Sequence, residues 1–545
     1  MAETIRGADA LVEALAQAGI RTVFTLSGNH IMPVFDAVLG RGIELIHTRH
    51  EAAAVHMADA FARLTGEAGI ALVTGGQGHT NAVAGLSTAL AGEVPLVLLS
   101  GHAPWGEIGL GAFQELRNAD LAAPVTKAAW AARSAATLAE DLARAIRIAR
   151  TGRPGPVHLS LPTDVLEARL DPAGIAWPDP AAFAPEAMPL APEAAAMVRA
   201  QLSRATRPLI IAPPALCTPR GRVLLKGLRN ALGIPVVPME SPRGINDPSL
   251  GAFAEVLAEA DLILLLGKQL DFTLRFGRAP AIAAACRWMV LDPDPVLIER
   301  VARTQRERLI LAALAGPHEA AATLAQGHLD ADHTAWTARV EAAIAYRPAA
   351  WDAHRGKASG AIHPVTLCDA LAPYLERDPD AVLVSDGGEI GQWAQALLSA
   401  PNRVINGVAG AIGPSIPFAM AARRTRLDST VLAVLGDGTF GFHMAEFDTA
   451  VRHNLPFVAV VGNDSRWNAE HQIQLREYGA QRAHGCSLAP ATRYDLVATA
   501  LGGHGEFVQD AAELPAALER AFASGRPACV NVLIEGQAAP VVRQG

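Results

Sequence analysis

The chain has 545 residues, which is too many for one hydrophobic core and favours roughly three or four domains. Half of the residues are apolar, as in an ordinary globular protein. The formal net charge is −8 at pH 7, and no cluster of lysines and arginines stands out. A nucleic acid or an anionic membrane surface is therefore disfavoured as a partner.

The beginning of the chain has an amphipathic pattern and lacks the basic start and continuous apolar core of a signal peptide. The longest apolar runs, such as Val94 to Leu99, have the length of strands and are too short to span a bilayer. We therefore expect a cytoplasmic protein without a membrane partner. The cysteines are far apart and form no CxxC pair, which predicts reduced thiols: Cys217, Cys286, Cys368, Cys486 and Cys529.

Helical and extended patterns alternate along the chain. The first helices are predicted at Gly7 to Ala18, Glu51 to Arg63 and Asn81 to Ala91, and the first strands at Thr22 to Leu26, Gly69 to Thr74 and Pro95 to Ser100. The strands are continuous apolar runs without alternation, which indicates that both of their faces are covered. The predicted fold class is α/β with parallel sheets.

Two irregular stretches rich in proline and alanine, Asp171 to Pro192 and Tyr346 to His363, are predicted to be linkers. They divide the chain into three domains, at residues 1–175, 190–340 and 358–545. The first and last domains share a layout in which an early helix is followed by strands that run into glycine-rich turns. No strict sequence repeat accompanies this likeness.

The strongest motif lies between Val431 and Gln474. An apolar strand ends in Gly436-Asp437-Gly438, a helix is expected from His443 to Arg452, and a second strand ends in Asn463-Asp464. The carboxyl ends of parallel strands are where open α/β sheets bind ligands. Oxygen-bearing side chains beside glycines suit a Mg²⁺ ion that holds a phosphate. Simple tight turns are the alternative for each half of the motif.

The combined motif resembles the metal–diphosphate motif of thiamine-diphosphate enzymes, with 24 residues between Gly438 and Asn463. The resemblance implies that the side chains of Asp437 and Asp464 and the backbone carbonyl of Arg466 bind Mg²⁺. Asp464 departs from the family, which usually has a second asparagine there. Asn463 is the alternative ligand if the register of the loop differs by one residue.

Further segments resemble the family's cofactor-binding loops. Ile412 corresponds to the apolar residue that holds the cofactor in a bent shape, and a stiff β-branched side chain suits that role. Packing of glycine-rich turns is the alternative. The other residues in this domain that are expected to bind the cofactor are Gly388, Glu389, Ile390, Gly410, Gly436, Asp437, Gly438, Thr439, Asp464 and Trp467.

In the N-terminal domain, Arg49-His50-Glu51 resembles the family segment that carries the activating acid. By resemblance, Glu51 hydrogen-bonds the pyrimidine ring of the cofactor and promotes loss of the proton from the thiazolium ring. Compensation of a helix dipole is the alternative role for this glutamate. Gly76 and Asn81 belong to a loop expected near the pyrimidine.

Three more residues are predicted to act on the substrate. Gln114 lies in a segment similar to one of acetolactate synthases, where the glutamine faces the active centre. Asn29 and His30 lie in a segment, Phe24 to Ile31, that resembles an active-site loop of the family, and benzaldehyde lyase has a histidine at the place of His30. By resemblance, both residues are expected to bind the substrate carbonyl or move a proton. A histidine that caps the next helix is the alternative for His30.

The resemblance covers nearly the whole chain and implies pyrimidine-binding, middle and diphosphate-binding domains. It also implies a homodimer or homotetramer in which the cofactor lies between Glu51 of one subunit and Asp437 of another. The middle part has no clear FAD signature, so FAD is not indicated, although synthases of this family often keep it.

The implied activity is lysis or ligation of carbon–carbon bonds in 2-keto acids or 2-hydroxy ketones, in the manner of acetolactate synthase or benzaldehyde lyase. The alternative is a 2-hydroxyacyl-CoA lyase or an oxalyl-CoA-type decarboxylase, because residues 260–267 and 272–277 are similar to those enzymes. The stretch from Trp467 to Leu475 departs from all of these families.

Overall fold

The structure is a computed structural model that describes residues 4–544 of the chain. Its residues form two compact units. The first extends up to Glu186 and includes residues 420–425 and 445–454, whereas the second contains the other described residues. Three parallel sheets confirm the predicted α/β fold class, whereas the bounds of the three predicted domains stay a prediction.

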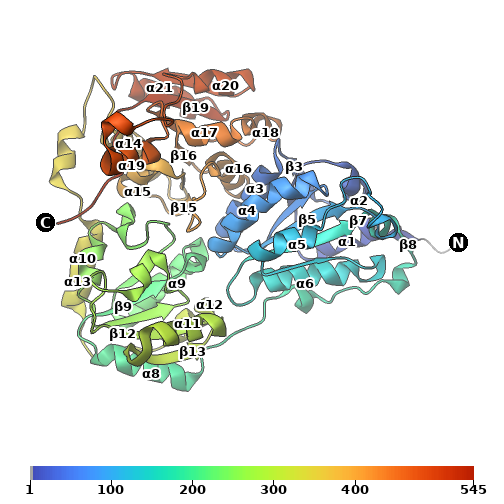
Figure 1. The fold of residues 1–545 in the computed structure, drawn as a ribbon, viewed down its shortest axis with the longest axis horizontal. Helices are drawn as coiled ribbons and strands as arrows, with labels where there is room; N and C mark the ends of the chain where they lie inside the picture. Colours follow the sequence, from blue (N-terminus) through green and yellow to red (C-terminus); the bar gives the residue numbers. More distant parts are fainter. Residues whose placement is uncertain (1–3, 545) are drawn as a thin grey trace. The chain divides into compact units, whose positions relative to one another are not determined.

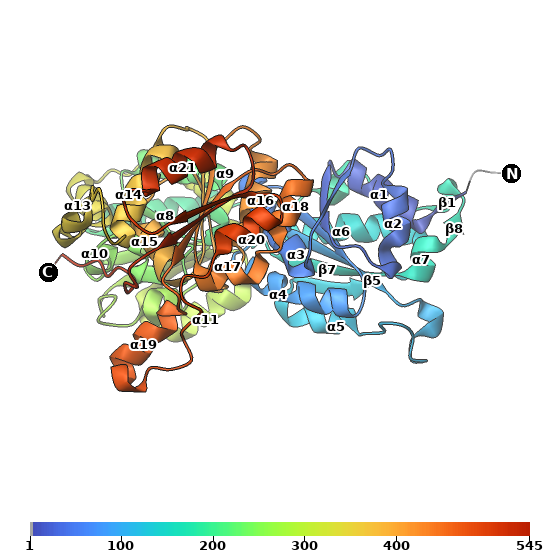
Figure 2. The ribbon, with the colours of Figure 1, turned by 90° about the horizontal axis from the view of Figure 1, so that it is seen from above.

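The first unit contains a six-stranded parallel sheet with the strand order β3-β2-β4-β5-β7-β6. Helices α1 and α6 pack together, α3 and α4 pack together, and the two pairs lie on opposite faces of the sheet (Figure 2). The sheet is β2 (Thr22–Thr25), β3 (Glu44–His47), β4 (Gly69–Val73), β5 (Leu96–His102), β6 (Ala128–Ala131) and β7 (Pro156–Pro162). The helices are α1 (Gly7–Gln17), α2 (Met32–Ala37), α3 (Glu51–Thr65), α4 (Gln77–Ala91), α5 (Asn118–Ala122), α6 (Leu138–Arg150) and α7 (Thr163–Glu167).

The second unit contains two parallel sheets (Figure 1). The one nearer the N-terminus in sequence has five strands in the order β10-β9-β11-β12-β13. These are β9 (Pro208–Ala212), β10 (Val236–Pro238), β11 (Leu262–Leu266), β12 (Arg287–Asp292) and β13 (Leu309–Leu314). The helices of this part are α8 (Pro192–Arg204), α9 (Pro219–Leu232), α10 (Phe253–Leu257), α11 (Pro295–Gln305), α12 (Pro317–Leu324) and α13 (Thr334–Ala345).

The other sheet has six parallel strands in the order β15-β14-β16-β17-β19-β18. They are β14 (Val382–Ser385), β15 (Asn402–Ile405), β16 (Val431–Gly436), β17 (Val458–Asn463), β18 (His504–Val508) and β19 (Ala528–Leu533). The C-terminal helices are α14 (Pro364–Glu376), α15 (Gly388–Leu397), α16 (Ser415–Thr425), α17 (Asp437–His443), α18 (Glu446–Arg452), α19 (Asn468–Tyr478), α20 (Tyr494–Ala500) and α21 (Leu514–Ala523). Counted along the chain, both six-stranded sheets have the same strand order, which confirms the shared layout of the first and last parts.

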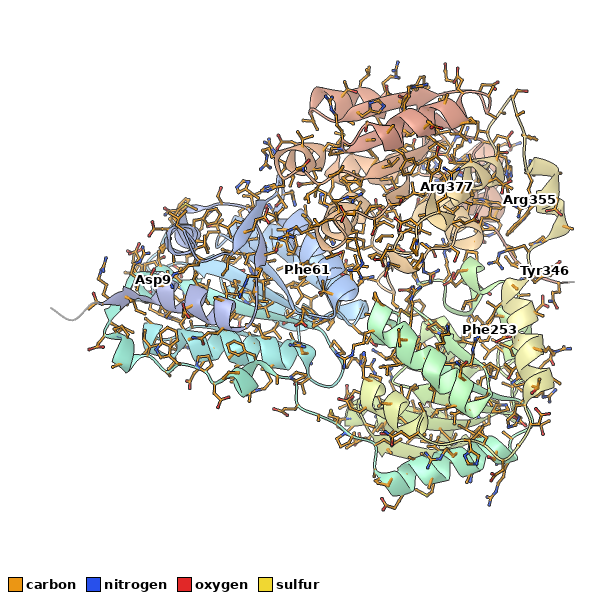
Figure 3. The ribbon with its side chains drawn as sticks, turned by 180° about the vertical axis from the view of Figure 1, so that it is seen from behind. Asp9, Phe61, Phe253, Tyr346, Arg355 and Arg377 are labelled. Atoms are coloured by element: carbon orange, nitrogen blue, oxygen red, sulfur yellow. The ribbon has the colours of Figure 1, made fainter. Side chains whose placement is uncertain are left out.

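Local sequence explains where these elements begin and pack. β11 is fully buried and reads as an unbroken run of leucine and isoleucine, as a strand covered on both faces should. Thr218 caps α9 and Pro219 follows at its first position, where proline loses no helical hydrogen bond. Phe61 of α3, labelled in Figure 3, packs edge-on against Phe24 of β2 with ring centroids 5.7 Å apart.

Two predicted helices begin at different residues in the structure. The helix expected from His443 to Arg452 is two helices, α17 and α18, and α17 begins at Asp437 itself. Gly436 is extended and ends β16, so the strand passes directly into the helix without the predicted tight turn. α4 begins at Gln77 rather than Asn81, because Gly76 adopts a positive φ of 59° and turns the chain there.

The two predicted linkers contain no long helix or strand. The first includes short 3₁₀ helices at Pro172–Gly174 and Pro180–Phe183, and the second has one at Ala349–His354, which precedes Arg355 in Figure 3. A short antiparallel pair, β1 (Ile5–Arg6) with β8 (Arg169–Leu170), precedes the first linker. Among residues 4–544, every helix is too short or too polar to cross a bilayer.

Candidate functional site

A small cavity of about 70 Å³ lies at the carboxyl ends of β14, β16 and β17 in the second unit. The chain leaves β14 for β15 on one side and later returns to β16 on the other, so the cavity lies where the strand order reverses. Its lining includes Gly387, Gly388, Glu389, Ile390, Ile412, Gly436, Asp437, Gly438, Thr439, Gly462, Asp464, Arg466, Trp467, Asn468, Ala469 and Glu470. Most of the cofactor-binding residues predicted in this domain therefore lie together.

Glycines create the space in which these side chains approach the backbone. A Cβ atom on Gly438 would lie 2.7 Å from the indole ring of Trp467. A Cβ atom on Gly387 would lie 2.7 Å from the Cγ2 atom of Ile412. Both distances are too short for any larger residue, so the glycines of the motif have a steric role as well as leaving backbone N–H groups accessible.

The carboxylates of Asp437 and Asp464 give the cavity its charge. Burial raises the pKa of Asp437 to about 6. Burial and then the neighbouring Asp437 raise the pKa of Asp464 to about 7. The Oδ1 atom of Asp437 accepts the N–H of Gly438 at 3.0 Å, while its buried Oδ2 atom has no hydrogen-bond partner among the described residues. Two close acids, one with an unpaired oxygen, suit a hard divalent cation.

The protein alone supplies few ligands here. Among residues 4–544, no group of three or more His, Cys, Asp and Glu side chains could hold a metal ion. A cation at the Asp437–Asp464 pair would therefore need backbone carbonyls and oxygens of a bound phosphate to complete its coordination, as Mg²⁺ commonly does.

Two predicted residues lie elsewhere. The side chain of Asn463 points into the sheet, where its Nδ2 atom donates to Asn531 Oδ1 at 3.1 Å and its Oδ1 atom accepts the N–H of Ser465 at 3.2 Å. It does not line the cavity. Gly410 also lies outside the lining, and a Cβ atom there would face Pro242 at 3.6 Å. This geometry favours Asp464 over Asn463 as the residue that faces a bound cation.

In the first unit, Glu51 is the first residue of α3 and its side chain is buried. The Nδ2 atom of Asn81 donates to Glu51 Oε2 at 3.0 Å. A Cβ atom on Gly78 would lie 3.2 Å from Glu51 Oε1, so the first turn of α4 needs a small residue there. The structure thus brings together Glu51 and Asn81, two of the predicted residues, at the starts of neighbouring helices.

His30, Gln114 and Gly76 also lie together. The Nδ1 atom of His30 is 3.2 Å from Thr74 Oγ1, and the ring of Phe113 stacks on the His30 ring at a centroid distance of 6.0 Å. Burial lowers the pKa of His30, which keeps the ring neutral at pH 7. Gln114 has a positive φ of 54°, which is strained for a residue other than glycine, and a Cβ atom on Gly76 would touch it.

Asn29 is exposed at the start of the 3₁₀ helix Asn29–Ile31, whereas the neighbouring His30 is 4% exposed. The adjacent side chains of this loop thus differ in environment, and only His30 is fixed by the core. This placement favours a proton-moving or orienting role for His30 and a solvent-side role for Asn29.

Some residues that shape the site were not predicted. Asp386 is fully buried and accepts the N–H groups of Gly387, Gly413 and Ser415, so it joins the end of β14 to the loop that carries Ile412. Thr74 links His30 to the loop before α4. Each of these two residues is a polar residue that directly follows an apolar strand, and this position was the signal that the sequence offered. Their hydrogen-bond partners across the site are too distant in sequence to be inferred.

Comparisons with known proteins agree with this geometry. The family described as "Thiamine pyrophosphate enzyme, N-terminal TPP binding domain" matches residues 5–122, and its C-terminal TPP binding domain matches residues 386–532. A probable acetolactate synthase of Mycobacterium bovis is 34% identical over 98% of this chain and 96% of its own length. This chain belongs to the thiamine pyrophosphate enzyme family. Thiamine pyrophosphate is another name for thiamine diphosphate.

Other members of the family are nearly as similar. The 2-hydroxyacyl-CoA lyase 2 of Danio rerio is 30% identical over 97% of this chain and 91% of its own length. The human 2-hydroxyacyl-CoA lyase 2 is 30% identical over 97% of this chain and 90% of its own length. The protein is therefore a thiamine-diphosphate-dependent enzyme that makes or breaks carbon–carbon bonds, as the sequence predicts.

Proposed function

We propose that this thiamine-diphosphate enzyme cleaves or joins the carbon–carbon bond next to a carbonyl in 2-keto acids or 2-hydroxy ketones. The proposal rests above all on the buried Glu51 carboxylate that Asn81 orients at 3.0 Å, since an acid of this kind is needed to activate the cofactor. The similarity to a probable acetolactate synthase supports this substrate class.

Bound thiamine diphosphate would supply a thiazolium carbon that adds to the substrate carbonyl and accepts its electrons. Glu51 would hold a proton at the pyrimidine ring, and Asn81 would keep its carboxylate in one rotamer. His30 would exchange a proton with the substrate oxygen through its neutral ring. Gln114, held in a strained backbone conformation, would donate to that oxygen.

We also propose that Mg²⁺ joins the diphosphate to the second unit through the side chains of Asp437 and Asp464 and the backbone carbonyl of Arg466. The unpaired Oδ2 atom of Asp437 supports this assignment. Ile412, 37% exposed, would support the middle of the cofactor. The remaining glycines of the cavity would leave N–H groups free for phosphate oxygens.

The active assembly is proposed to be a cytoplasmic homodimer or homotetramer. Glu51 belongs to the first compact unit and Asp437 to the second. A cofactor bound at its two ends by these residues would be shared between subunits, with Glu51 from one chain and Asp437 from another.

The substrate class is tested by a proton NMR time course of the purified full chain with thiamine diphosphate, Mg²⁺ and pyruvate, beside a control without the cofactor. Cofactor-dependent loss of pyruvate is the expected result, with acetolactate or acetaldehyde as the product. If pyruvate is stable and simple 2-hydroxy ketones are also untouched, the proposed substrate class is wrong.

A second candidate is cleavage of a 2-hydroxyacyl-CoA or decarboxylation of an oxalyl-CoA-type thioester. Its support is the 30% identity to 2-hydroxyacyl-CoA lyases over nearly the full chain. The same NMR experiment with a 2-hydroxyacyl-CoA distinguishes the two, because aldehyde release from the thioester in the absence of pyruvate turnover would establish the second candidate.

A further inference from the structure

The backbone shortly before Glu51 is held, at His47 and Arg49, by helix α18 and the residue that follows it, His453. The N–H of His47 donates to the Nε2 atom of His453 at 3.0 Å, and the carbonyl of His47 accepts from Arg452 Nη2 at 2.7 Å. These contacts fix the end of β3. The first compact unit includes residues 445–454, so the contacts lie within one unit.

The most specific contact is made by Glu446, whose side chain is 1% exposed. Its two carboxylate oxygens accept the same N–H, that of Arg49, at 3.0 and 3.1 Å. The N–H of His50 also faces this carboxylate. Thr449 Oγ1 donates to the Oε2 atom of Glu446 at 2.6 Å, which orients the carboxylate from its own helix.

These N–H groups lie immediately before α3, which begins at Glu51. The N–H groups at the start of a helix have no partners within the helix and need acceptors from elsewhere. His50 caps the helix by accepting the N–H of Ala52 on its ring. Glu446 therefore fixes the backbone that sets the direction of the first turn, and with it the direction of the Glu51 side chain.

We infer that Glu446 is a positioning residue for Glu51, and that it holds the first turn of α3 so that the Glu51 carboxylate meets Asn81 and the cofactor. This inference rests on the proposed role of Glu51. Glu446 does not touch the cofactor cavity and acts only through the backbone of Arg49 and His50.

Glu446→Gln tests the inference, because the amide keeps the volume but places an N–H₂ group against the donors of Arg49 and His50. Asp448→Asn is the matched control. Asp448 is on the same helix, but its carboxylate pairs with two side chains, those of Arg49, at 3.6 Å, and Arg452, at 2.8 Å. The control therefore removes a charge and leaves the backbone acceptor in place.

Two readouts are needed. In the cofactor-free full chain, amide hydrogen exchange at residues 49–54 reports whether the first turn loosens. In the chain loaded with thiamine diphosphate and Mg²⁺, exchange of the thiazolium C2 proton for deuterium reports activation of the cofactor, independently of any substrate. Glu446→Gln should speed the amide exchange and slow the C2 exchange by about 10- to 100-fold. Cofactor affinity should change by less than about threefold.

Wild-type C2 exchange in Glu446→Gln would overturn the inference, and so would an equal loss in Asp448→Asn. If Glu446→Gln does not fold, Glu446→Asp takes its place. Its carboxylate is one methylene short, so C2 exchange should again fall, and a wild-type rate would contradict the inference. Glu51→Gln serves as the reference, because full C2 exchange in that variant would show that the proposed role of Glu51, rather than the role of Glu446, is wrong.

Discussion

Asp464 is the residue at which this chain departs from the metal motif that it resembles, and burial and then its neighbour Asp437 raise its pKa. Two carboxylates repel each other without a cation and attract one strongly when it is present. Asp464→Asn should therefore still bind Mg²⁺ but more weakly, by about tenfold or ~1.4 kcal/mol. Titration of Mg²⁺ at saturating thiamine diphosphate, followed by intrinsic tryptophan fluorescence to which Trp467 beside Gly438 contributes, measures this.

Asp437→Asn is the companion variant, and its Mg²⁺ affinity should fall further, because Asp437 has the unpaired buried oxygen. If both variants bind Mg²⁺ as tightly as the wild type, neither carboxylate is a ligand and the metal assignment is wrong.

His79 gives a pH-dependent prediction. Burial lowers its pKa to about 4, from 6.5 in an unfolded chain, because its ring is enclosed with that of His158 at a centroid distance of 4.5 Å. Below pH 6.5, His79 binds a proton in the unfolded chain but stays neutral in the folded chain. The free energy of unfolding therefore falls as the pH drops from 6.5 towards 4. The full loss is about 3 kcal/mol.

His79→Asn should therefore lose less thermal stability than the wild type between about pH 7 and pH 5. The difference in Tm between the two pH values, measured for both proteins, isolates this effect from other titrating groups. His328→Gln, at an exposed position, is the control and should behave as the wild type. Equal losses in His79→Asn and the wild type would contradict the prediction.

At the scale of residues, local motifs indicated which side chains would lie together. Asp437 and Asp464 line one cavity and Glu51 is buried at the start of α3, as expected, while their roles stay proposals. Asp386 and Glu446 were not found, since what they do depends on partners 27 and 397 positions away along the chain. A single sequence contains no local sign of such contacts.

At the scale of elements, the ion pair of Glu240 and Arg403 joins the end of β10 to β15 within the second unit. The Nε and Nη2 atoms of Arg403 donate to Glu240 Oε1 at 3.0 and 2.7 Å, and the Glu240 side chain is 8% exposed. Removing one partner of a buried pair leaves an uncompensated charge.

Arg403→Met should consequently lower the free energy of unfolding by about 3 kcal/mol. The double variant Glu240→Met with Arg403→Met should recover part of that loss, because the carboxylate that Arg403 neutralised is gone, whereas the neighbouring Arg222 and Asp247 remain. Thermal unfolding of the two variants and of Glu240→Met alone forms a double-mutant cycle. Additive losses would show that the pair does not couple the two strands.

The elements themselves were largely predictable, and the errors have a physical origin. Continuous apolar runs identified strands such as β4 and β5 within one or two residues. The error at α17 arose because glycine and aspartate usually favour a turn, whereas here extended Gly436 lets the helix begin directly at Asp437. Trp467 packs against Gly438, which is compatible with a helix that begins at Asp437. This contact could not be inferred from the sequence around Asp437.

At the scale of the whole molecule, the two six-stranded sheets share one strand order although their sequences show no strict repeat. In each of these sheets, proposed site residues follow a strand next to the point where the strand order reverses. Asn29 and His30 follow β2 in the N-terminal sheet, and Asp437 follows β16 in the C-terminal sheet. The fold class and the family could therefore be predicted from the sequence. The substrate could not, because it depends on the side chains around the cavity. These include side chains of α19, whose sequence departs from the related families and which projects from its unit in Figure 2.

In the proposed assembly, one active site combines Glu51 of one chain with Asp437 of another, and mixing two inactive variants tests this most directly. Glu51→Gln and Asp437→Asn should each be inactive alone. After subunit exchange, hybrid dimers would contain one site with both residues intact, so activity should return to about a quarter of the wild-type value. Substantial activity of either variant alone, or a mixture that stays inactive although hybrids are shown to form, would contradict this shared site.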